Sequence, residues 1–231
     1  MISICRGFAF ALGTVLSVTC HADGASIAKN GMGAALACQT CHGAAGEGLA
    51  QAGFPRLASL GAPYLQRQLD AFADGTRVNA VMMPIAKALS VADRAAVSAY
   101  YAALPVPTVP TVPTAPTASA TALPVAPASA TAASPTPSGI GATLATRGRW
   151  ADKLPACEQC HGPGGRGVGP EFPALAGQSA AYLSNQLTAW KTGARPPGPM
   201  GLMAVVAKKL SDAEISAVAD HFASLPAGVS R

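Results

Sequence analysis

Aromatic and charged residues are scarce in this sequence. Of its 231 residues, 5% are aromatic and 12% are charged, although 50% are hydrophobic. Small residues and proline make up much of the remainder, so the chain has little bulky material from which to build a core. A small domain of this composition usually needs a disulfide, a metal or another covalently held group for stability. We therefore expect a stabilising group in addition to side-chain packing.

Basic runs and long apolar runs are also lacking. The formal net charge is +5, and the lysines and arginines are spread along the chain rather than gathered in the patch that nucleic-acid binding needs. Beyond the N-terminal segment, no stretch is long and apolar enough to span a membrane. The sequence therefore predicts no nucleic-acid partner and no membrane span in the mature chain.

The N-terminal segment has the layout of a secretory signal peptide. Arg6 precedes an apolar run over residues 8–18, and the small residue Ala22 follows. This run is too short for a transmembrane helix. We expect cleavage after Ala22, which removes residues 1–22 and places the mature chain in the periplasm. A lipoprotein attached through Cys20 and a retained N-terminal anchor are the alternatives.

Residues 105–138 have a very restricted composition. They are almost wholly proline, threonine, alanine, valine and serine, and none is charged. Such a segment cannot make a regular helix or strand and is typical of a semi-rigid, extended linker. The linker divides the mature chain into a first domain at residues 23–104 and a second domain at residues 139–231.

The two domains repeat one another. The stretch Cys38–Gly43 matches Cys157–Gly162, and a Phe-Pro-x-Leu-Ala segment and a Tyr-Leu-x-x-Gln-Leu segment then recur in the same order. The largest insertion, of three residues, falls in the proline-rich loop at residues 196–199, where extra residues cost little. A shared order of features with loop-sized insertions indicates an internal duplication.

Both copies are predicted to be all-α. Ser90 and Ser211 each begin a capping signature, and apolar residues recur at helical spacing after them until a proline ends the segment. Earlier in the first copy we expect a helix after Pro63 and another that runs from about Ala25 towards Cys38. No stretch alternates between apolar and polar residues as a strand would. The expected architecture is two homologous helical domains joined by a long Pro/Thr/Ala-rich linker.

The pattern Cys-x-x-Cys-His occurs once in each copy. Its members are Cys38, Cys41 and His42 in the first domain, and Cys157, Cys160 and His161 in the second. This pattern is the attachment site of a c-type heme. Two cysteines on one helical turn can form thioethers with the two vinyl groups of a porphyrin, and the adjacent histidine can then reach the iron. We predict two covalently attached hemes c, one in each domain, with both histidines as iron ligands.

Other uses of the cysteines are less consistent with the sequence. A Cys-x-x-Cys pair could be a disulfide, a redox pair or half of a zinc site, and the two pairs together could close one zinc site. However, both motifs continue directly into histidine, and a long linker makes closure of a shared site costly. The other two cysteines, Cys5 and Cys20, lie in the expected signal peptide, so none remains for a structural disulfide.

The second iron ligand is expected from a methionine just before the last helix of each domain. Met82 and Met203 occupy the same position in the pattern Met-x-x-(Ile/Val)-Ala-x-x-Leu-Ser. A methionine is often only an adaptable core residue, and Met83 and Met200 lie nearby. The repeat decides between them, because Met83 aligns with Ala204 and Met200 aligns with no methionine. We predict Met82 and Met203 as the ligands.

Three further polar residues are candidates for weaker roles. His221 aligns with Tyr100, so a second histidine ligand would have no equivalent in the first domain, and we expect His221 to be a packing or surface residue. Arg77 and Arg195 occupy matching positions. They could pair with the acidic groups of the two hemes, and ordinary solvated arginines are the alternative.

Each half resembles the class I c-type cytochromes, and the whole is similar to the diheme cytochromes of the c-four type from bacterial periplasms. The resemblance covers about residues 25–104 and 140–226. It rests on the heme-attachment motif, the Phe-Pro-x-Leu-Ala segment, the Tyr-Leu-x-x-Gln-Leu helix and the Met-x-x-x-Ala-x-x-Leu-Ser pattern. The chain departs from that family in its linker, which is long and proline-rich where the family has a short connection. We therefore expect that the domains can move apart.

The resemblance also implies a role for four residues around the hemes. The carbonyls of Pro55 and Pro173 would accept a hydrogen bond from the ligating histidines, which fixes the imidazole rings. Leu57 and Leu175 would pack on the hemes.

We predict that the protein is a carrier of single electrons rather than an enzyme. A histidine and a methionine together fill both axial positions of the iron, which suits electron transfer better than substrate activation. The expected partners are redox proteins, namely a dehydrogenase, an oxidase or a quinol–cytochrome c reductase.

Two alternatives remain open from the sequence. The chain could be the dedicated electron-accepting subunit of a periplasmic sulfur-compound or alcohol dehydrogenase, which the long tether favours. It could also be a heme enzyme, such as a peroxidase or a thiosulfate-type oxidase. That function needs an open iron site with acid or base groups above it, and neither domain has a convincing spare histidine or base.

Overall fold

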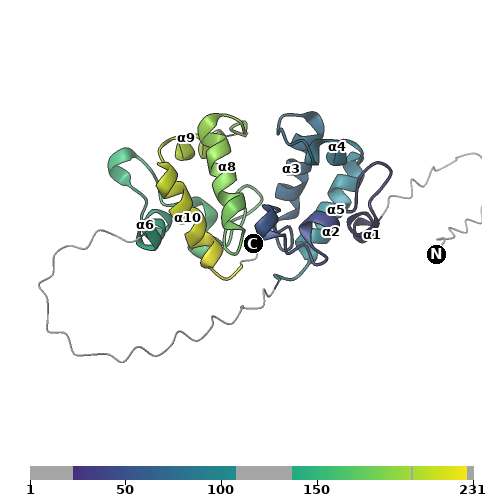
Figure 1. The fold of residues 1–231 in the computed structure, drawn as a ribbon, viewed down its shortest axis with the longest axis horizontal. Coiled ribbons are helices and arrows are strands. Elements are labelled where there is room, and N and C mark those ends of the chain that lie inside the picture. Colours follow the sequence, from purple (N-terminus) through teal and green to yellow (C-terminus); the bar gives the residue numbers. More distant parts are fainter. Residues whose placement is uncertain (1–22, 108–136, 199, 228–231) are drawn as a thin grey trace, which may run out of the picture.

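The computed structural model describes residues 23–107, 137–198 and 200–227. Within these ranges the regular structure is helical, apart from a few isolated β-bridges in the loops (Figure 1). The predicted all-α architecture is therefore confirmed. The expected signal peptide at residues 1–22 and most of the expected linker lie outside the described residues.

The first domain consists of five α-helices and one short 3-10 helix. They are α1 (Gly24–Asn30), α2 (Gln39–His42), η1 (Ala50–Ala52), α3 (Ala62–Asp74), α4 (Met82–Lys87) and α5 (Val91–Ala103). The first helix is shorter than the sequence predicted, because Gly31 adopts a φ of 72° that ends it. A tight turn with paired backbone hydrogen bonds between Met32 and Ala35 then leads towards α2.

The second domain repeats this order. Its elements are α6 (Pro137–Thr146), η2 (Trp150–Asp152), α7 (Cys157–His161), η3 (Pro163–Gly165), α8 (Ala180–Thr192), α9 (Leu202–Lys208) and α10 (Asp212–Ser224). The helices α6, α7, α8, α9 and α10 correspond to α1, α2, α3, α4 and α5 of the first domain. The internal duplication inferred from the sequence is therefore a duplication of structure.

The last helix of each domain begins where the capping signature predicted. Ser90 accepts a hydrogen bond from the backbone N–H of Asp93, and the Asp93 carboxylate accepts one from the backbone N–H of Ser90. Ser211 and Glu214 form the same reciprocal pair at the start of α10. Each pair satisfies two backbone N–H groups that a helix start otherwise leaves without partners.

The first and last helices of each domain cross at very close range. A Cβ atom on Gly24 would lie 2.2 Å from the carbonyl oxygen of Ala96 in α5, and one on Gly141 would lie 2.1 Å from that of Ala217 in α10. Glycine is therefore required at both crossings. The cores beside these crossings contain equivalent buried residues, among them Ile27, Val97 and Tyr101 in the first domain and Leu144, Val218 and Phe222 in the second.

The two domains pack against each other. The helices α3 and α8 face one another across the middle of the molecule (Figure 1), and hydrogen bonds link the domains directly. Arg77 donates to Gln186, and in the equivalent contact Arg195 donates to Gln68. In this structure, side-chain contacts hold the two domains together; that the domains can also move apart stays a prediction.

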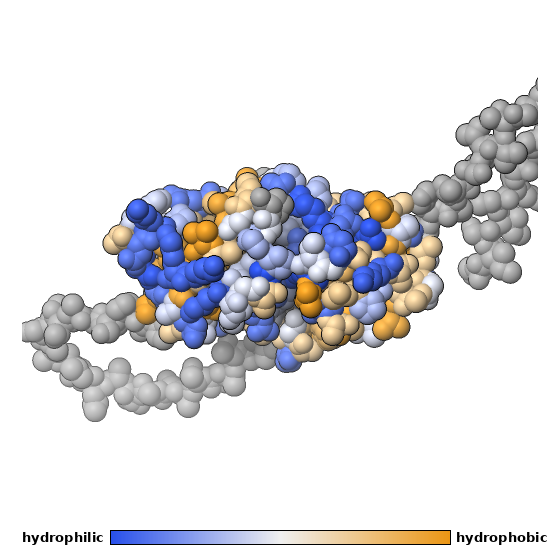
Figure 2. Space-filling view, turned by 90° about the horizontal axis from the view of Figure 1, so that it is seen from above, coloured by the Kyte–Doolittle hydropathy of each residue, from blue (hydrophilic) through white to orange (hydrophobic). Residues whose placement is uncertain are grey.

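On the face seen from above, hydrophilic and hydrophobic residues are interspersed (Figure 2). In the part of the chain that the structure describes, no helix is both long enough and apolar enough to cross a membrane.

Candidate functional site

The cysteine–histidine motifs lie on the short helices α2 and α7. Cys157, Cys160 and His161 all belong to α7, whereas Cys38 caps the N-terminus of α2 and Cys41 and His42 follow inside it. One helical turn thus carries both cysteines of each motif and the histidine that follows. All four cysteines are free thiols and partly exposed, while both histidines are buried.

A proline carbonyl holds each of these histidines. The Nδ1 atom of His42 lies 2.9 Å from the carbonyl oxygen of Pro55, and that of His161 lies 2.8 Å from the carbonyl oxygen of Pro173. A carbonyl can only accept, so Nδ1 carries the proton and Nε2 keeps its lone pair. Burial lowers the pKa of both histidines, which favours this neutral form at pH 7, although the bond to the carbonyl opposes the shift. Each ring is therefore oriented and protonated as an iron ligand needs to be.

The thiols do not have the properties of a redox-active pair. Burial raises the pKa of Cys38 and raises that of Cys157 to about 11, whereas reactive Cys-x-x-Cys pairs have a lowered thiol pKa. Among the described residues, no three His, Cys, Asp or Glu side chains gather closely enough to hold a metal ion. All four cysteines of the two motifs lie within the described residues, so the two pairs do not meet in one zinc site.

A cavity of about 540 Å³ opens beside α2 in the first domain. Its lining includes all four residues predicted to attach or ligate the first heme, namely Cys38, Cys41, His42 and Met82, together with the predicted packing residue Leu57. Cofactor sites commonly have volumes of roughly 300–1,000 Å³. The fold thus gathers the predicted ligand set of the first domain around one cavity of suitable size.

The wall of this cavity is apolar on one side and basic on the other. Apolar side chains from α3, α4 and α5 line it, among them Leu65, Leu69, Phe72, Ile85 and Val97. The boundary with the second domain supplies Arg77 and Arg195, which donate to Gln68 and Gln186 but to no described carboxylate. A heme is an apolar macrocycle with two carboxylates at one edge, and this lining therefore fits it.

Two hydroxyl groups strengthen the fit of the first cavity to a bound group. Ser98 and Tyr101 line it with buried side-chain oxygens; that of Ser98 has no hydrogen-bond partner among the described residues, and that of Tyr101 has only the Cys38 thiol beside it. Burying a polar group without a partner is costly.

Arg77 is only 8% exposed, and its guanidinium stacks on the Phe72 ring at 4.5 Å from the ring centroid. The alternative of a fully solvated arginine is therefore wrong for Arg77.

The second domain arranges the matching residues around its own core. Cys157, Leu175 and Met203 pack against the cluster formed by α6, α8 and α10. Of the competing methionines, Met200 is 57% exposed, which is unsuitable for a ligand beside a buried histidine.

His221 does not line the cavity described above. It is in the last turn of α10, where its ring contacts Phe222 edge-on at 5.2 Å, as Tyr100 contacts Tyr101 in the first domain. Its Cβ atom lies close to Gly141 of α6. The position is a packing position, as the sequence predicted.

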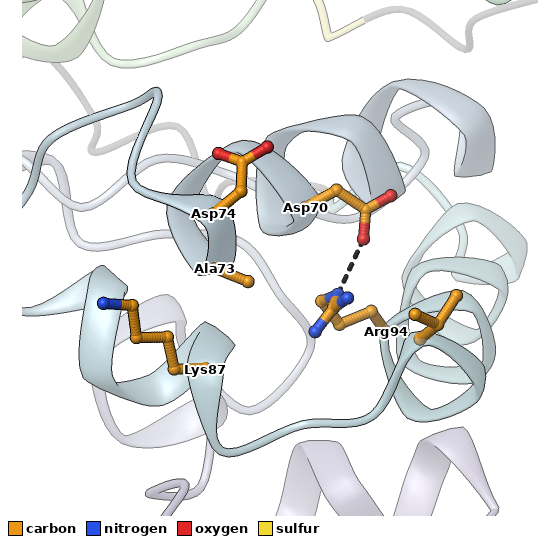
Figure 3. Close-up of a pocket in the computed structure, with 6 residues that line it drawn as sticks. Asp70, Ala73, Asp74, Lys87 and Arg94 are labelled. Carbon is orange, nitrogen blue, oxygen red and sulfur yellow. Dashed lines mark hydrogen bonds and ion pairs between the residues drawn. The ribbon is translucent and has the colours of Figure 1, made fainter.

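A second hollow of about 420 Å³ lies between α3, α4 and α5 (Figure 3). Arg94 spans it, donating to the Asp70 carboxylate at 2.6 Å and to the carbonyls of Ala86 and Leu89. The Asp74 carboxylate accepts from Thr76. The hydrogen bonds of Arg94 join α5 to α3 and to the end of α4, so we assign the hollow a structural role.

Sequence reasoning missed the polar residues between the domains. Gln68, Gln186 and Tyr182 contact the two equivalent arginines, and in the sequence they look like surface residues of an amphipathic helix. The signal that could have found them is their recurrence, because the Tyr-Leu-x-x-Gln-Leu segment and its downstream arginine occur in both copies.

Comparison with known proteins agrees with this geometry. The sequence model of the cytochrome c family matches the chain twice, at residues 21–104 and 140–226. The chain therefore belongs to the cytochrome c family and contains two cytochrome c domains, whose Cys-x-x-Cys-His motifs imply covalently attached heme c.

Individual relatives narrow the class further. The thiosulfate dehydrogenase electron acceptor of Stutzerimonas stutzeri is 45% identical over 206 residues, which cover 88% of this chain and 87% of the relative. Cytochrome c4 of Pseudomonas aeruginosa is 32% identical over 212 residues, which cover 91% of this chain and 94% of the relative. The chain is thus a c4-like diheme cytochrome c, an electron carrier.

A solved thiosulfate dehydrogenase from Marichromatium purpuratum also resembles the chain. The two are 43% identical and superpose with a TM-score of 0.72 over 88% of this chain, which spans 40% of that longer protein. The chain therefore corresponds to one part of that protein.

Proposed function

We propose that this protein is the periplasmic electron acceptor of a thiosulfate dehydrogenase. The observation that carries the proposal is the 45% identity to a thiosulfate dehydrogenase electron acceptor across nearly the whole of both chains. The likeness to part of a solved thiosulfate dehydrogenase supports it independently. A sulfur-compound dehydrogenase is therefore preferred as the donor over an alcohol dehydrogenase or an unspecialised set of redox partners.

The residues around each site have distinct roles in this function. When bound, a heme c with two axial ligands supplies a one-electron couple. His42 with Met82, and His161 with Met203, would be the ligands. The bonds from the histidines to the carbonyls of Pro55 and Pro173 hold the rings in one orientation.

The apolar lining has a second role, which is to exclude water. Leu57 lines the first cavity, and Leu175 packs on the core of the second domain. A dry, fixed environment reduces the rearrangement that accompanies electron transfer, which is the contribution a protein makes around such a cofactor.

The rim of the first cavity offers a surface for the donor. Leu36, Val78 and Val81 line the cavity yet are 66%, 70% and 50% exposed. Exposed apolar side chains around a cofactor edge suit a small, short-lived contact of the kind found between redox proteins. Electrons would enter or leave the protein here.

Export is part of the same proposal. We infer that residues 1–22 are a cleaved signal peptide and that residues 105–138 are a linker, as the composition predicts. The N-terminal sequence and mass of the protein purified from a periplasmic fraction test the cleavage after Ala22.

The direct test mixes the heme-loaded protein anaerobically with a thiosulfate dehydrogenase and thiosulfate. We expect both hemes to be reduced, with a rate that saturates as the concentration of this protein rises. Thiosulfate without the enzyme, and an alcohol dehydrogenase with its own substrate, are the controls. No enzymatic reduction of a protein that dithionite does reduce would contradict the proposal, as would equal reduction by the alcohol dehydrogenase.

A further inference from the structure

The contacts between the two domains are mostly symmetric. Arg77 donates to Gln68 of its own domain at 2.8 Å and to Gln186 of the other at 2.7 Å. Arg195 donates to Gln186 of its own domain and to Gln68 of the other, both at 2.8 Å. The matching positions of the duplicated sequence therefore meet across an approximate two-fold axis.

Arg56 breaks this symmetry. Its backbone N–H donates to the side-chain oxygen of Gln178 at 2.8 Å, and the side-chain nitrogen of Gln178 donates back to the Arg56 carbonyl at 3.1 Å. Both residues are 3% exposed. The Gln178 amide thus satisfies the backbone of a residue in the other domain as a neighbouring strand would.

The Arg56 side chain lies between the two domains. Its guanidinium donates to the carbonyl of Ala58 in its own domain and, at 3.1 Å, to that of Ala176 in the other. Ala58 and Ala176 are equivalent positions of the repeat. Because the Arg56 guanidinium bridges two equivalent carbonyls, it lies close to the approximate two-fold axis. A second guanidinium from the equivalent position of the other domain would compete for the same space.

The second domain has no such arginine. The position equivalent to Arg56 is Ala174, and the position equivalent to Gln178 is Leu60. Ala174 and Leu60 are buried, 3% and 4% exposed, and belong to the same apolar cluster. One half of the interface is therefore a polar pair of Arg56 with Gln178, and the other half is an apolar pair of Leu60 with Ala174.

We propose that these two unlike pairs are the specificity determinant that makes the first domain pack on the second and not on a copy of itself. Two first domains would bring Arg56 against Leu60 and two guanidiniums into one space. Two second domains would bring no guanidinium to the buried carbonyls of their two Ala176 residues, which Arg56 reaches here. Buried polar groups without partners are costly, and such mismatches are how interfaces reject wrong partners.

The pairs also have a consequence for electron transfer, which rests on the proposed heme sites. The hydrogen bonds of Arg56 and Gln178 hold the first domain against the second, so these two are positioning residues for electron transfer between the two proposed heme sites.

The experiment compares four variants of the full-length, heme-loaded protein by small-angle X-ray scattering. Arg56→Ala removes the guanidinium from the carbonyls of Ala58 and Ala176, and Gln178→Leu sets a leucine against Arg56, so each should shift the ratio of packed to separated molecules about tenfold or more towards separation. The double variant repeats the Leu60–Ala174 arrangement on both sides and should be compact again. Arg67→Ala, which removes an exposed contact to Glu171 across the same interface, is the control and should change nothing.

The rate of electron transfer between the hemes after rapid photoreduction is the second readout. It should fall in the two single variants and recover in the double variant, while the absorption spectrum of each heme stays unchanged in all four. Single variants as compact as the parent protein, or a double variant as extended as the singles, would overturn the proposal. Both results are independent of whether a thiosulfate dehydrogenase reduces the protein, so the two proposals can fail separately.

Discussion

Single residues decide what each heme site can do. His42 and His161 are buried, and each donates a hydrogen bond to a proline carbonyl thirteen or twelve residues downstream. That bond fixes the proton on Nδ1, so Nε2 would keep its lone pair for a heme iron. The methionine proposed to complete each site lies in a different helix, α4 or α9.

The methionine assignment leads to a prediction about the reduction potentials. Met82→Ala and Met203→Ala should each lower the potential of one heme, because a thioether ligand stabilises the reduced iron. We expect a change of about tenfold or more in the equilibrium between the oxidised and reduced forms, which is about 59 mV for a one-electron couple. An optical redox titration measures it.

Neighbouring methionines provide the matched controls. Met83→Ala and Met200→Ala should leave both potentials unchanged and both hemes closed to cyanide, whereas the ligand variants should bind it. If Met82→Ala and Met83→Ala behave alike, the assignment of the ligand in the first domain is wrong.

At the scale of helices, the close approach of two helix backbones determines the residue at the crossing more strongly than helix propensity does. Gly24 lies in α1 and Gly141 in α6, where alanine would favour the helix by about 1 kcal/mol. Both positions face a backbone carbonyl at a distance that leaves no room for a Cβ atom. The crossing of the first and last helices therefore depends on glycine in both domains.

This crossing gives a prediction about stability. Gly24→Ala should lower the thermal midpoint of the first domain, because forcing a methyl group against the Ala96 carbonyl costs about 1–3 kcal/mol, more than the gain in propensity. Thermal unfolding followed by circular dichroism measures it. Lys29→Ala, at an exposed position of the same helix, should have little effect, and an equal or higher midpoint in Gly24→Ala would contradict the close crossing.

Helices were also the scale at which the sequence was most informative. The capping residues Ser90 and Ser211 located the last helices, because a side-chain cap and an apolar face are both local features of the sequence. The first helix was predicted too long, because the conformation of Gly31 depends on the turn that follows. The ligand sets could be proposed from spacing and repetition alone.

The packing of the whole molecule could not be predicted in this way. Gln68, Arg77 and Gln178 look like solvated residues, and their partners lie more than a hundred positions away in the chain. Nothing in a local pattern shows that two polar faces are complementary. The duplication nevertheless contained the information, because residues that meet across the interface recur in both copies or are replaced in matched pairs.

The whole molecule is best described as two similar electron sites held by one asymmetric interface. The shared fold places a buried histidine in each domain, a methionine is the proposed second ligand in each, and the interface adds Arg77 and Arg195 between the domains. An electron carrier built in this way can accept an electron at one site and pass it to the other without leaving the partner protein.

The most direct test of this account is an optical redox titration, with intact mass, of the protein made with a c-type maturation system. The account predicts a mass increase of two hemes and two one-electron, low-spin centres with the spectrum of histidine–methionine ligation. A single heme, or a high-spin centre that binds cyanide in the unmodified protein, would contradict it.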